Sequence, residues 1–547
     1  MTEPRVATDD GSPPPSGLVE AVLAHESALM ADDDGALGRS FERSAFAASV
    51  DEAGVTVGHE AIAAARGRAR EIARGAGEQG AGEKGVSEQD ANAPVVSGIL
   101  VHRAGPGVAH VVSETDHEGG RRSFASRLWR QGDDGRWRIV TEHTATPTPS
   151  ANVAPAVASP AVDARVWRLV GSPLVSGSGA GPLSGHTVAV KDLFAVAGFR
   201  RGLGVRAYLA NSPMEFETAP AVRALLDAGA DVVGIAQTDQ FAYSIAGLNP
   251  DYGTPPNPAV PQGIPGGSSS GPASAVSLGQ ATIGLGTDTA GSIRVPASYQ
   301  GLWGLRPTHG AIPLQGVAPL APSYDTVGYL ARDGETLLAV ASVGLAGAPF
   351  TRPAQRVLVP DGPVTPDPDV TRAFREAALA LAPNADRVGF PRFAELFEAF
   401  RITQQAEAWR SDGAWVTAHP GTLAGDVAAR FAAASGVTAQ REREAIAERD
   451  KLAAVLDATL GDAVLLIPAT ASAAPSLTAT DDELEAARAA TLGLTTIAGI
   501  TGRPALSVPL MSVPGGPVGI SLVGPRGSDL ALIRMAISWA RNSGAKP

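Results

Sequence analysis

Residues 265–307 place two loops rich in glycine and hydroxyl groups on either side of a short apolar unit. The segment reads PGGSSSGPASAVSLGQATIGLGTDTAGSIRVPASYQGLWGLRP. The first loop leads into a predicted helix, Pro272–Gly279, and a predicted buried strand, Ala281–Leu285, follows it. The second loop is Gly286–Ser292. Each loop sets hydroxyls beside backbone N–H groups, which suits the binding of an anion, either a phosphate or the oxyanion of acyl transfer.

The composition excludes several classes of protein and of chemistry. A chain of 547 residues is long enough for two or three domains. Its formal net charge of −12, without basic clusters, argues against nucleic acid as a main partner. Cysteine is absent, which excludes disulfides, thiolate catalysis and Cys-ligated zinc. The polar N-terminus lacks a signal-peptide core and no charge-free apolar run reaches about 18 residues, so we expect a soluble cytoplasmic protein without membrane contact.

A domain boundary is predicted at residues 147–163, because this Pro- and Ala-rich stretch is typical of a semi-extended linker. Beyond it, residues 164–547 alternate strands and helices, which predicts an α/β domain with a parallel or mixed central sheet covered by helices. The expected elements are a strand in His186–Phe194, a helix and strand in Ala219–Gln237, a helical region in Pro366–Leu460, strands at Ala463–Ala469 and Pro504–Leu510, and a helix at Asp481–Ile500.

Lys191, Ser268 and Ser292 are the candidate chemical groups. A serine hydroxyl is a poor nucleophile until a neighbour removes its proton, and neither loop holds a histidine, so a neutral lysine is the available base. Lys191 follows the apolar run Val188–Val190, where burial can bring a lysine pKa from about 10.4 to roughly 7–8. Taken singly, such a lysine is usually ion-paired or exposed, and a GGSSSG run is usually a turn. A phosphate loop would end in GK[ST], which is missing here.

Two motifs carry a resemblance to a known family. GGSSSG at Gly266–Gly271 and GTDTAGSIRVP at Gly286–Pro296 resemble the loops of the amidase signature family, at that family's spacing, and the likeness covers about residues 164–547. Within the family, Thr238–Pro258 and Thr495–Leu510 are most similar to indole-3-acetamide hydrolases. The resemblance implies the amidase signature fold, with no metal and no other cofactor.

The resemblance also implies a Ser–cis-Ser–Lys triad. Ser292 would be the nucleophile, Lys191 the base, and Ser268, after a cis Gly267–Ser268 bond, the proton relay. The remaining implied roles are an oxyanion hole of backbone N–H groups at Thr289, Ala290 and Gly291, supporting or loop-shaping roles for Ser269, Asp288 and Arg294, and substrate contact by Tyr243 and Ser244. Ala290 stands where many relatives have glycine. Trp415 and His419 either pack in the core or line the pocket.

The chain before the linker predicts a smaller α+β domain at 17–146, after a disordered stretch at 1–16. Helices are expected from Gly17 and at His59–Arg74, and a low-complexity loop at Gly75–Ala93. Four strand-like runs follow, at Val95–His102, Val108–Thr115, Ser123–Arg130 and Trp137–His143. Two helices before such a sheet, with SRLWRQGDDGRWRIVTEHT at Ser126–Thr144, resemble the nuclear-transport-factor-like cone fold that accompanies amidases of biuret and cyanuric-acid breakdown.

The leading functional hypothesis is hydrolysis of a small carboxamide to a carboxylate and ammonia through an acyl-enzyme on Ser292. The substrate class stays open between aryl-acetamides and ureido compounds. One alternative is the glutaminase component of a tRNA-dependent amidotransferase, and another is a non-catalytic binding or oligomerisation module. A homo-oligomer, such as a dimer formed through the N-terminal domain, is expected by analogy with other cone domains.

Overall fold

The computed structural model describes residues 5–8, 13–30, 48–51, 54–57, 95–105, 107–116, 122–145, 162–352, 356–362, 364–390 and 393–542. The chain divides into two compact units, Met1–Val157 and Ala158–Pro547, which are described in turn. The predicted helix at 59–74, the predicted loop at 75–93 and nearly all of the predicted linker at 147–163 lie outside the described residues.

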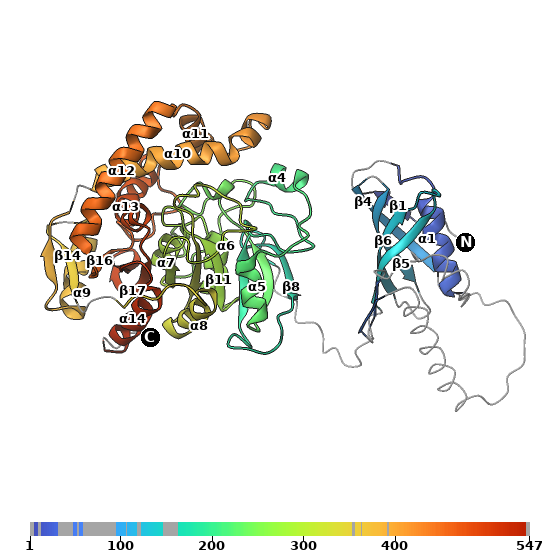
Figure 1. The fold of residues 1–547 in the computed structure, drawn as a ribbon, viewed down its shortest axis with the longest axis horizontal. Helices are drawn as coiled ribbons and strands as arrows, with labels where there is room; N and C mark the ends of the chain where they lie inside the picture. Colours follow the sequence, from blue (N-terminus) through green and yellow to red (C-terminus); the bar gives the residue numbers. More distant parts are fainter. Residues whose placement is uncertain are drawn as a thin grey trace, which may run out of the picture. The chain divides into compact units, whose positions relative to one another are not determined.

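The first unit packs helix α1 (Leu18–Met30) against a mixed, mainly antiparallel sheet (Figure 1). Its described strands follow the order β1-β4-β5-β6-β7-β2-β3. Strands β4 (Val95–Gly105), β5 (Val108–Asp116), β6 (Arg122–Gln131) and β7 (Trp137–Ala145) confirm the four predicted strand-like runs. Strands β2 (Ala48–Asp51) and β3 (Gly54–Val57) extend the sheet beyond β7. Leu18 and Val22 of α1 pack on Val101, Trp129 and Ile139 of the sheet, and these side chains form the core of the unit.

One prediction for this unit is wrong. Residues 1–16 are expected to be disordered, but Arg5–Thr8 forms strand β1, which pairs in parallel with β4 from Arg5 opposite Gly98 to Thr8 opposite Val101. The edge of β4 carries backbone N–H and C=O groups that require partners, and an extended segment supplies them whatever its local propensity. This pairing depends on a strand about ninety positions away, so the N-terminal composition gives no sign of it.

The second unit is built on an eleven-stranded mixed sheet, in the order β15-β14-β16-β18-β17-β12-β13-β11-β9-β10-β8. The strands are β8 (Trp167–Val175), β9 (Thr187–Lys191), β10 (Asp231–Ala236), β11 (Ile283–Thr287), β12 (Trp303–Arg306), β13 (Val327–Ala331), β14 (Val357–Pro360), β15 (Asp386–Val388), β16 (Val464–Pro468), β17 (Ala505–Val513) and β18 (Gly516–Val523). Strands β9, β10 and β11 run parallel, so their carboxyl ends meet at one edge of the sheet.

Helices flank this sheet, as the alternation of segments predicts. They are α4 (Arg206–Asn211), α5 (Pro220–Asp227), α6 (Ser270–Ser277), α7 (Arg294–Gln300), α8 (Gly334–Gly344), α9 (Pro368–Leu381), α10 (Phe393–Ala418), α11 (Gly425–Ser435), α12 (Ala439–Leu460), α13 (Asp481–Thr501) and α14 (Asp529–Asn542). Helices α10, α11 and α12 gather along one border of the unit, where Figure 1 draws them in orange. The predicted helical region at 366–460 is confirmed, apart from the short strand β15.

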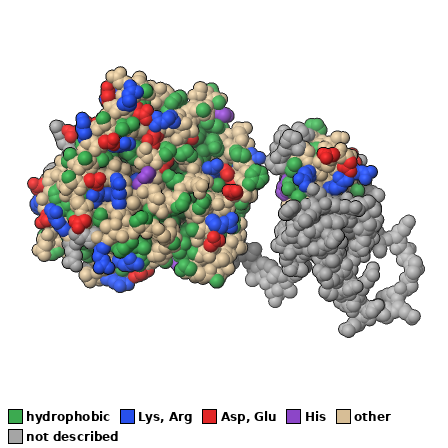
Figure 2. Space-filling model, in the orientation of Figure 1, with side chains coloured by type: hydrophobic (Ala, Val, Ile, Leu, Met, Phe, Trp, Pro, Cys, Tyr) green, Lys and Arg blue, Asp and Glu red, His purple; other side chains and the backbone are tan. Residues whose placement is uncertain are grey.

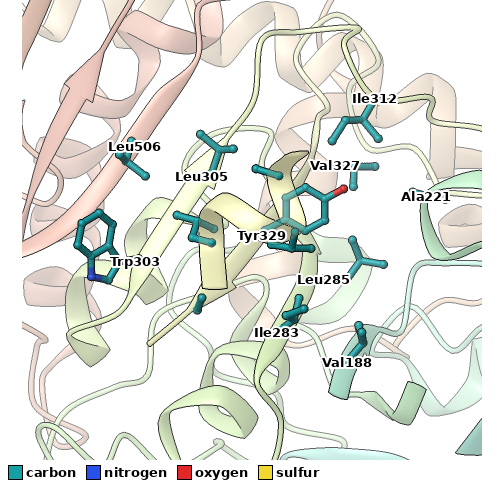
Figure 3. Packing of buried hydrophobic residues seen from close by; sticks show 14 of the residues in the cluster. Val188, Ala221, Ile283, Leu285, Trp303, Leu305, Ile312, Val327, Tyr329 and Leu506 are labelled. Atoms are coloured by element: carbon teal, nitrogen blue, oxygen red, sulfur yellow. The ribbon is translucent and has the colours of Figure 1, made fainter. Parts of the chain in front are cut away.

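Alternation along β11 separates the two faces of the sheet. Ile283 and Leu285 lie with Val188, Tyr329 and Leu506 in the apolar core (Figure 3). The glycines between them, Gly284 and Gly286, lie opposite Pro272 and Ser269, next to α6. An added Cβ at Gly286 would stand 2.5 Å from Ser269 Oγ. The small residues of this strand therefore let the serine-rich loop lie directly on the sheet.

The observed elements around the two loops differ slightly from the predicted ones. Helix α6 begins at Ser270 rather than Pro272, and β11 spans Ile283–Thr287 rather than Ala281–Leu285. The register with β13 extends the strand to Gly286 and Thr287, which local propensity assigns to a loop. Among the helices of the described residues, none is long and apolar enough to cross a membrane.

Candidate active site

The site is centred on Lys191, the last residue of β9. Its Nζ donates hydrogen bonds to Ser268 Oγ at 2.9 Å and to Thr287 Oγ1 at 2.8 Å. Thr287 ends the neighbouring parallel strand β11, so adjacent strand ends supply both the amine and one of its acceptors. The lysine side chain is fully buried, and no carboxylate forms a salt bridge with it among the described residues.

Burial favours the neutral form of the Lys191 amine over the protonated form. Desolvation lowers the pKa of Lys191 to about 7, although the negative charges of Asp239, Asp288 and Asp325 favour the protonated form. Burial also raises the pKa of Asp239 to about 6, where the Gly247 N–H (3.0 Å) and the Ser270 hydroxyl (3.1 Å) donate to its carboxylate. The amine can therefore accept a proton close to neutral pH.

The loop that carries Ser268 is closely packed. The peptide bond Gly267–Ser268 is cis, as predicted. An added Cβ at Gly267 would lie 2.3 Å from Asp239 Oδ2, so this position has room for glycine only. The next residue ties the loops together, since the Ser269 N–H donates to the Ser292 carbonyl (3.3 Å) and the Ser269 hydroxyl to the Thr287 carbonyl (3.2 Å). Ser269 thus lies where its expected supporting role would place it.

Ser292 lies in the second loop, 3% exposed, and lines a narrow cavity. Tyr243, Ser244, Thr289 and Ala290 line the same cavity, so the structure brings the expected substrate-contact residues to the expected nucleophile. Within the described residues, no hydrogen bond joins the hydroxyls of Ser268 and Ser292. A relay between them therefore requires the Ser292 side chain to turn toward Ser268.

Asp288 and its two arginines shape the second loop. The carboxylate forms ion pairs with Arg294 (2.8 Å) and Arg306 (3.1 Å), and each of the three side chains is at most 1% exposed. Burial alone would raise the pKa of Asp288, but Arg294 and Arg306 hold it well below the usual range. Arg294 also donates to the carbonyl of Thr495 on α13 (2.8 Å). These contacts are those expected of loop-shaping residues, whereas no sequence motif singles out Arg306.

The backbone of this loop differs from the expected oxyanion hole at Gly291. The Gly291 N–H already donates to Asp288 Oδ1 at 2.9 Å, so it is not a free donor. In the described structure, no acceptor faces the N–H groups of Thr289, Ala290 and Ser292. Ala290 does not adopt a positive φ, so alanine at this position distorts nothing.

Several residues near the site were assigned no role from the sequence, and of these only Thr287 lies in a sequence motif, GTDTAGSIRVP. Thr287, Asp325, Gln404 and Arg488 come from four separate segments. Thr289 donates to Asp325 at 2.5 Å, which ties the loop to the segment before β13. Ordinary polar residues on a helix or strand carry no motif, and only proximity in the fold reveals them.

Trp415 and His419 are partly exposed, and Trp415 packs against the core. Their rings stack with centroids 4.2 Å apart, and Trp415 also contacts Phe241. Neither lines the cavity at Ser292. Within the described residues, no cluster of three or more His, Asp or Glu side chains could hold a metal ion.

Comparisons with known proteins give the relatives of this chain. The family model described as Amidase matches residues 172–361. "Amidase 1" of Arabidopsis thaliana is 33% identical over 406 residues, which cover 68% of this chain and 96% of that protein. A glutamyl-tRNA(Gln) amidotransferase component of Thermus thermophilus is 31% identical over 408 residues, covering 65% of this chain and 84% of that protein. A solved amidase crystal structure is 32% identical, with a TM-score of 0.58, over 66% of this chain and 85% of that one.

Proposed function

The chain belongs to the amidase family of hydrolases that act on amide C–N bonds, and we propose that it converts a small carboxamide to a carboxylate and ammonia through an acyl-enzyme on Ser292. The observation that carries this proposal is the buried Lys191 amine, 2.9 Å from Ser268 Oγ, at the edge of the loop that bears Ser292. Asp288, Arg294 and Arg306 support it by fixing the backbone of that loop.

In the proposed reaction, neutral Lys191 accepts the proton of Ser268 while Ser268 accepts that of Ser292. The freed Ser292 oxygen bonds to the amide carbon, and the N–H groups of Thr289, Ala290 and Ser292 stabilise the resulting oxyanion. Return of the proton to the nitrogen breaks the C–N bond and releases ammonia. Water, activated through the same relay, then cleaves the ester and restores Ser292.

Replacement of the nucleophile tests this mechanism. Ser292→Ala should lower amide hydrolysis by roughly 10³-fold or more, since a triad acts as a unit. A fluorophosphonate probe should label the unmodified protein but not this variant. Ser342→Ala, a helix-surface serine whose hydroxyl donates to Leu338 O, is the matched control and should keep full activity. An active Ser292→Ala protein would refute the mechanism.

The amidotransferase alternative has support from relatives that are components of glutamyl-tRNA(Gln) amidotransferases. On the face shown in Figure 2, the basic and acidic side chains of the second unit are interspersed, and the described residues there form no broad basic area for tRNA. Ammonia release from glutamine only after addition of partner proteins would favour this alternative. We therefore keep the stand-alone amidase as the first proposal.

For the first unit we propose a nuclear-transport-factor-like cone that mediates self-association. The support is its architecture, a helix packed on a mainly antiparallel sheet, with strands at the predicted positions. We also propose that the protein acts in the cytoplasm, which fractionation of cells that produce it would test.

A further inference from the structure

Two cavities of the second unit meet at one arginine. The narrow cavity at Ser292 and a wider one of about 560 Å³ share Ile245 and Arg488 in their walls. Arg488 lies on α13, the helix whose Thr495 donates to the carbonyl of Ala290 in the nucleophile loop. A substrate that enters through the wide cavity to reach Ser292 must therefore pass beside this guanidinium.

Arg488 is incompletely paired. Its NH1 donates to Glu485 Oε1 at 3.0 Å, one turn earlier on the same helix. The side chain is only 16% exposed. Its Nε is buried and has no acceptor among the described residues. A buried, charged donor without an acceptor is costly, and such a group often marks a position that a ligand completes.

The two cavities differ in the charged side chains that line them. Arg430, in the wide cavity, is satisfied by Asp426 (2.9 Å) and by the Tyr243 carbonyl (2.8 Å). The wide cavity also carries Asp481 and Glu485, so its acidic and basic groups nearly balance. Of the described residues that line the narrow cavity with Ser292, only Arg488 is charged.

We propose that the substrate is an amide whose skeleton also bears a carboxylate, such as the monoamide of a dicarboxylic acid, and that Arg488 binds that carboxylate. This inference rests on the proposed amidase function and names its substrate class. A guanidinium donates in parallel to both oxygens of a carboxylate, so it fixes the distance between the anion and the scissile carbonyl. Arg488 is a substrate-binding residue in this scheme and takes no part in proton transfer.

Matched substrates test the proposal. Succinamate, glutaramate and adipamate should be hydrolysed with kcat/KM about tenfold or more above butyramide, valeramide and hexanamide, taking the best chain length of each series. Arg488→Gln should lower kcat/KM for the carboxylates by about tenfold to a hundredfold and change it for the neutral amides by less than about threefold. Arg488→Lys should recover part of the loss, because it restores the charge without the planar fork.

Two further variants distinguish a specific effect on carboxylate binding from a general effect on the fold. Glu485→Gln removes the carboxylate that competes for Arg488, so it should raise kcat/KM for succinamate or its best homologue severalfold. Arg541→Gln removes an arginine of α14 that pairs with Glu335 away from both cavities, and it should change nothing. A preference of the unmodified protein for neutral amides, or an equal loss on both series in Arg488→Gln, would overturn the proposal.

A binding measurement separates this proposal from the amidase assignment. In the Ser292→Ala background, calorimetry should detect the best monoamide of the carboxylate series, and adding Arg488→Gln should abolish the signal. If the probe labels Ser292 and only neutral amides react, the carboxylate proposal fails and the amidase function stands. If no amide reacts and Ser292 is not labelled, the proposed function fails. Calorimetry then still decides whether Arg488 binds a carboxylate, and absence of binding rejects that too.

Discussion

At the scale of single residues, the proposed chemistry depends on one amine kept out of water. Lys191 has two hydroxyl acceptors and no direct carboxylate partner among the described residues, so nothing fixes its proton strongly. Asp239, Asp288 and Asp325 act on it through space only, and they limit how far burial lowers its pKa. This balance keeps the pKa of the amine close to neutral, as the proposed role of a base requires.

The pH dependence of the reaction follows from Lys191. Only its neutral form accepts a proton, so kcat/KM should rise with pH through about 7. Lys191→Met should lower the rate by roughly 10³-fold or more, and Lys191→Arg should not rescue it, because a guanidinium stays protonated. Asp239→Asn removes a negative charge that raises the pKa of Lys191, so the rising limb should move to lower pH. A rate that is flat between pH 5.5 and 8.5 would contradict the assignment.

The ion pairs of Asp288 predict a large effect on stability. Asp288→Asn would leave Arg294 and Arg306 buried beside an uncharged amide, at a cost of about 3–5 kcal/mol in the free energy of unfolding. Urea unfolding curves would measure the change. The control is Asp386→Asn, whose partner Arg356 is also more than half exposed, and which should alter the free energy of unfolding by no more than about 0.5 kcal/mol. Equal curves for the two variants would show that the buried pairs do not hold the loop.

At the scale of elements, one strand determines how close the serine loop can lie to the sheet. The two glycines of β11 on the α6 side differ in the space above them. An added Cβ meets Ser269 Oγ at 2.5 Å at Gly286, but meets Leu330 Cβ and Pro272 O at 3.1 Å at Gly284. Ser269 also donates hydrogen bonds to the Ser292 and Thr287 carbonyls. A displacement of Ser269 caused by a larger residue at Gly286 would therefore affect both loops.

This difference yields a matched pair of variants on the same strand. Gly286→Ala should lower kcat by about tenfold or more and destabilise the unit by about 1–3 kcal/mol, because overpacking displaces Ser269. Gly284→Ala requires a shift of only a few tenths of an ångström and should keep most of the activity. Rates and thermal midpoints of both variants would test this difference. If Gly286→Ala were more active than Gly284→Ala, close packing of the serine loop would not be required for activity.

At the scale of the whole molecule, every described residue of the site belongs to the second unit, from Lys191 to Thr495. The unit has its own extensive core and its own sheet. The first unit therefore should not be needed for the chemistry.

Removal of residues 1–157 tests this division of labour. The shortened protein should keep kcat/KM within about threefold, since all the described residues of the site belong to the second unit. Its mass in solution, measured by light scattering, should fall to that of a monomer if the cone mediates self-association. An unchanged assembly state would reject the proposed role of the first unit, and a loss of activity with intact folding would show that the first unit contributes to catalysis.

Much of the fold could be predicted from the sequence because it depends on short-range patterns. Strands such as β9 and β16 follow continuous apolar runs, and α13 follows a capping signal at Thr480 and the glycine at its end. The candidate triad was visible for a different reason, since the two loops keep a rare combination of residue types at a known spacing. Lys191 alone is a weak signal, since a lysine after a strand is common, and its assignment to a triad came from that resemblance.

The amino-acid sequence by itself determined the alternation of strands and helices, the two serine loops and the candidate base. Tertiary structure alone decided what these groups touch: that β1 joins β4, that Asp288 occupies the Gly291 N–H, and that Lys191 meets Ser268, 77 positions away. It also decided that Arg488 lies between two cavities. The physical reason is range, because backbone preferences act over a few residues, whereas contacts and burial depend on how distant segments pack.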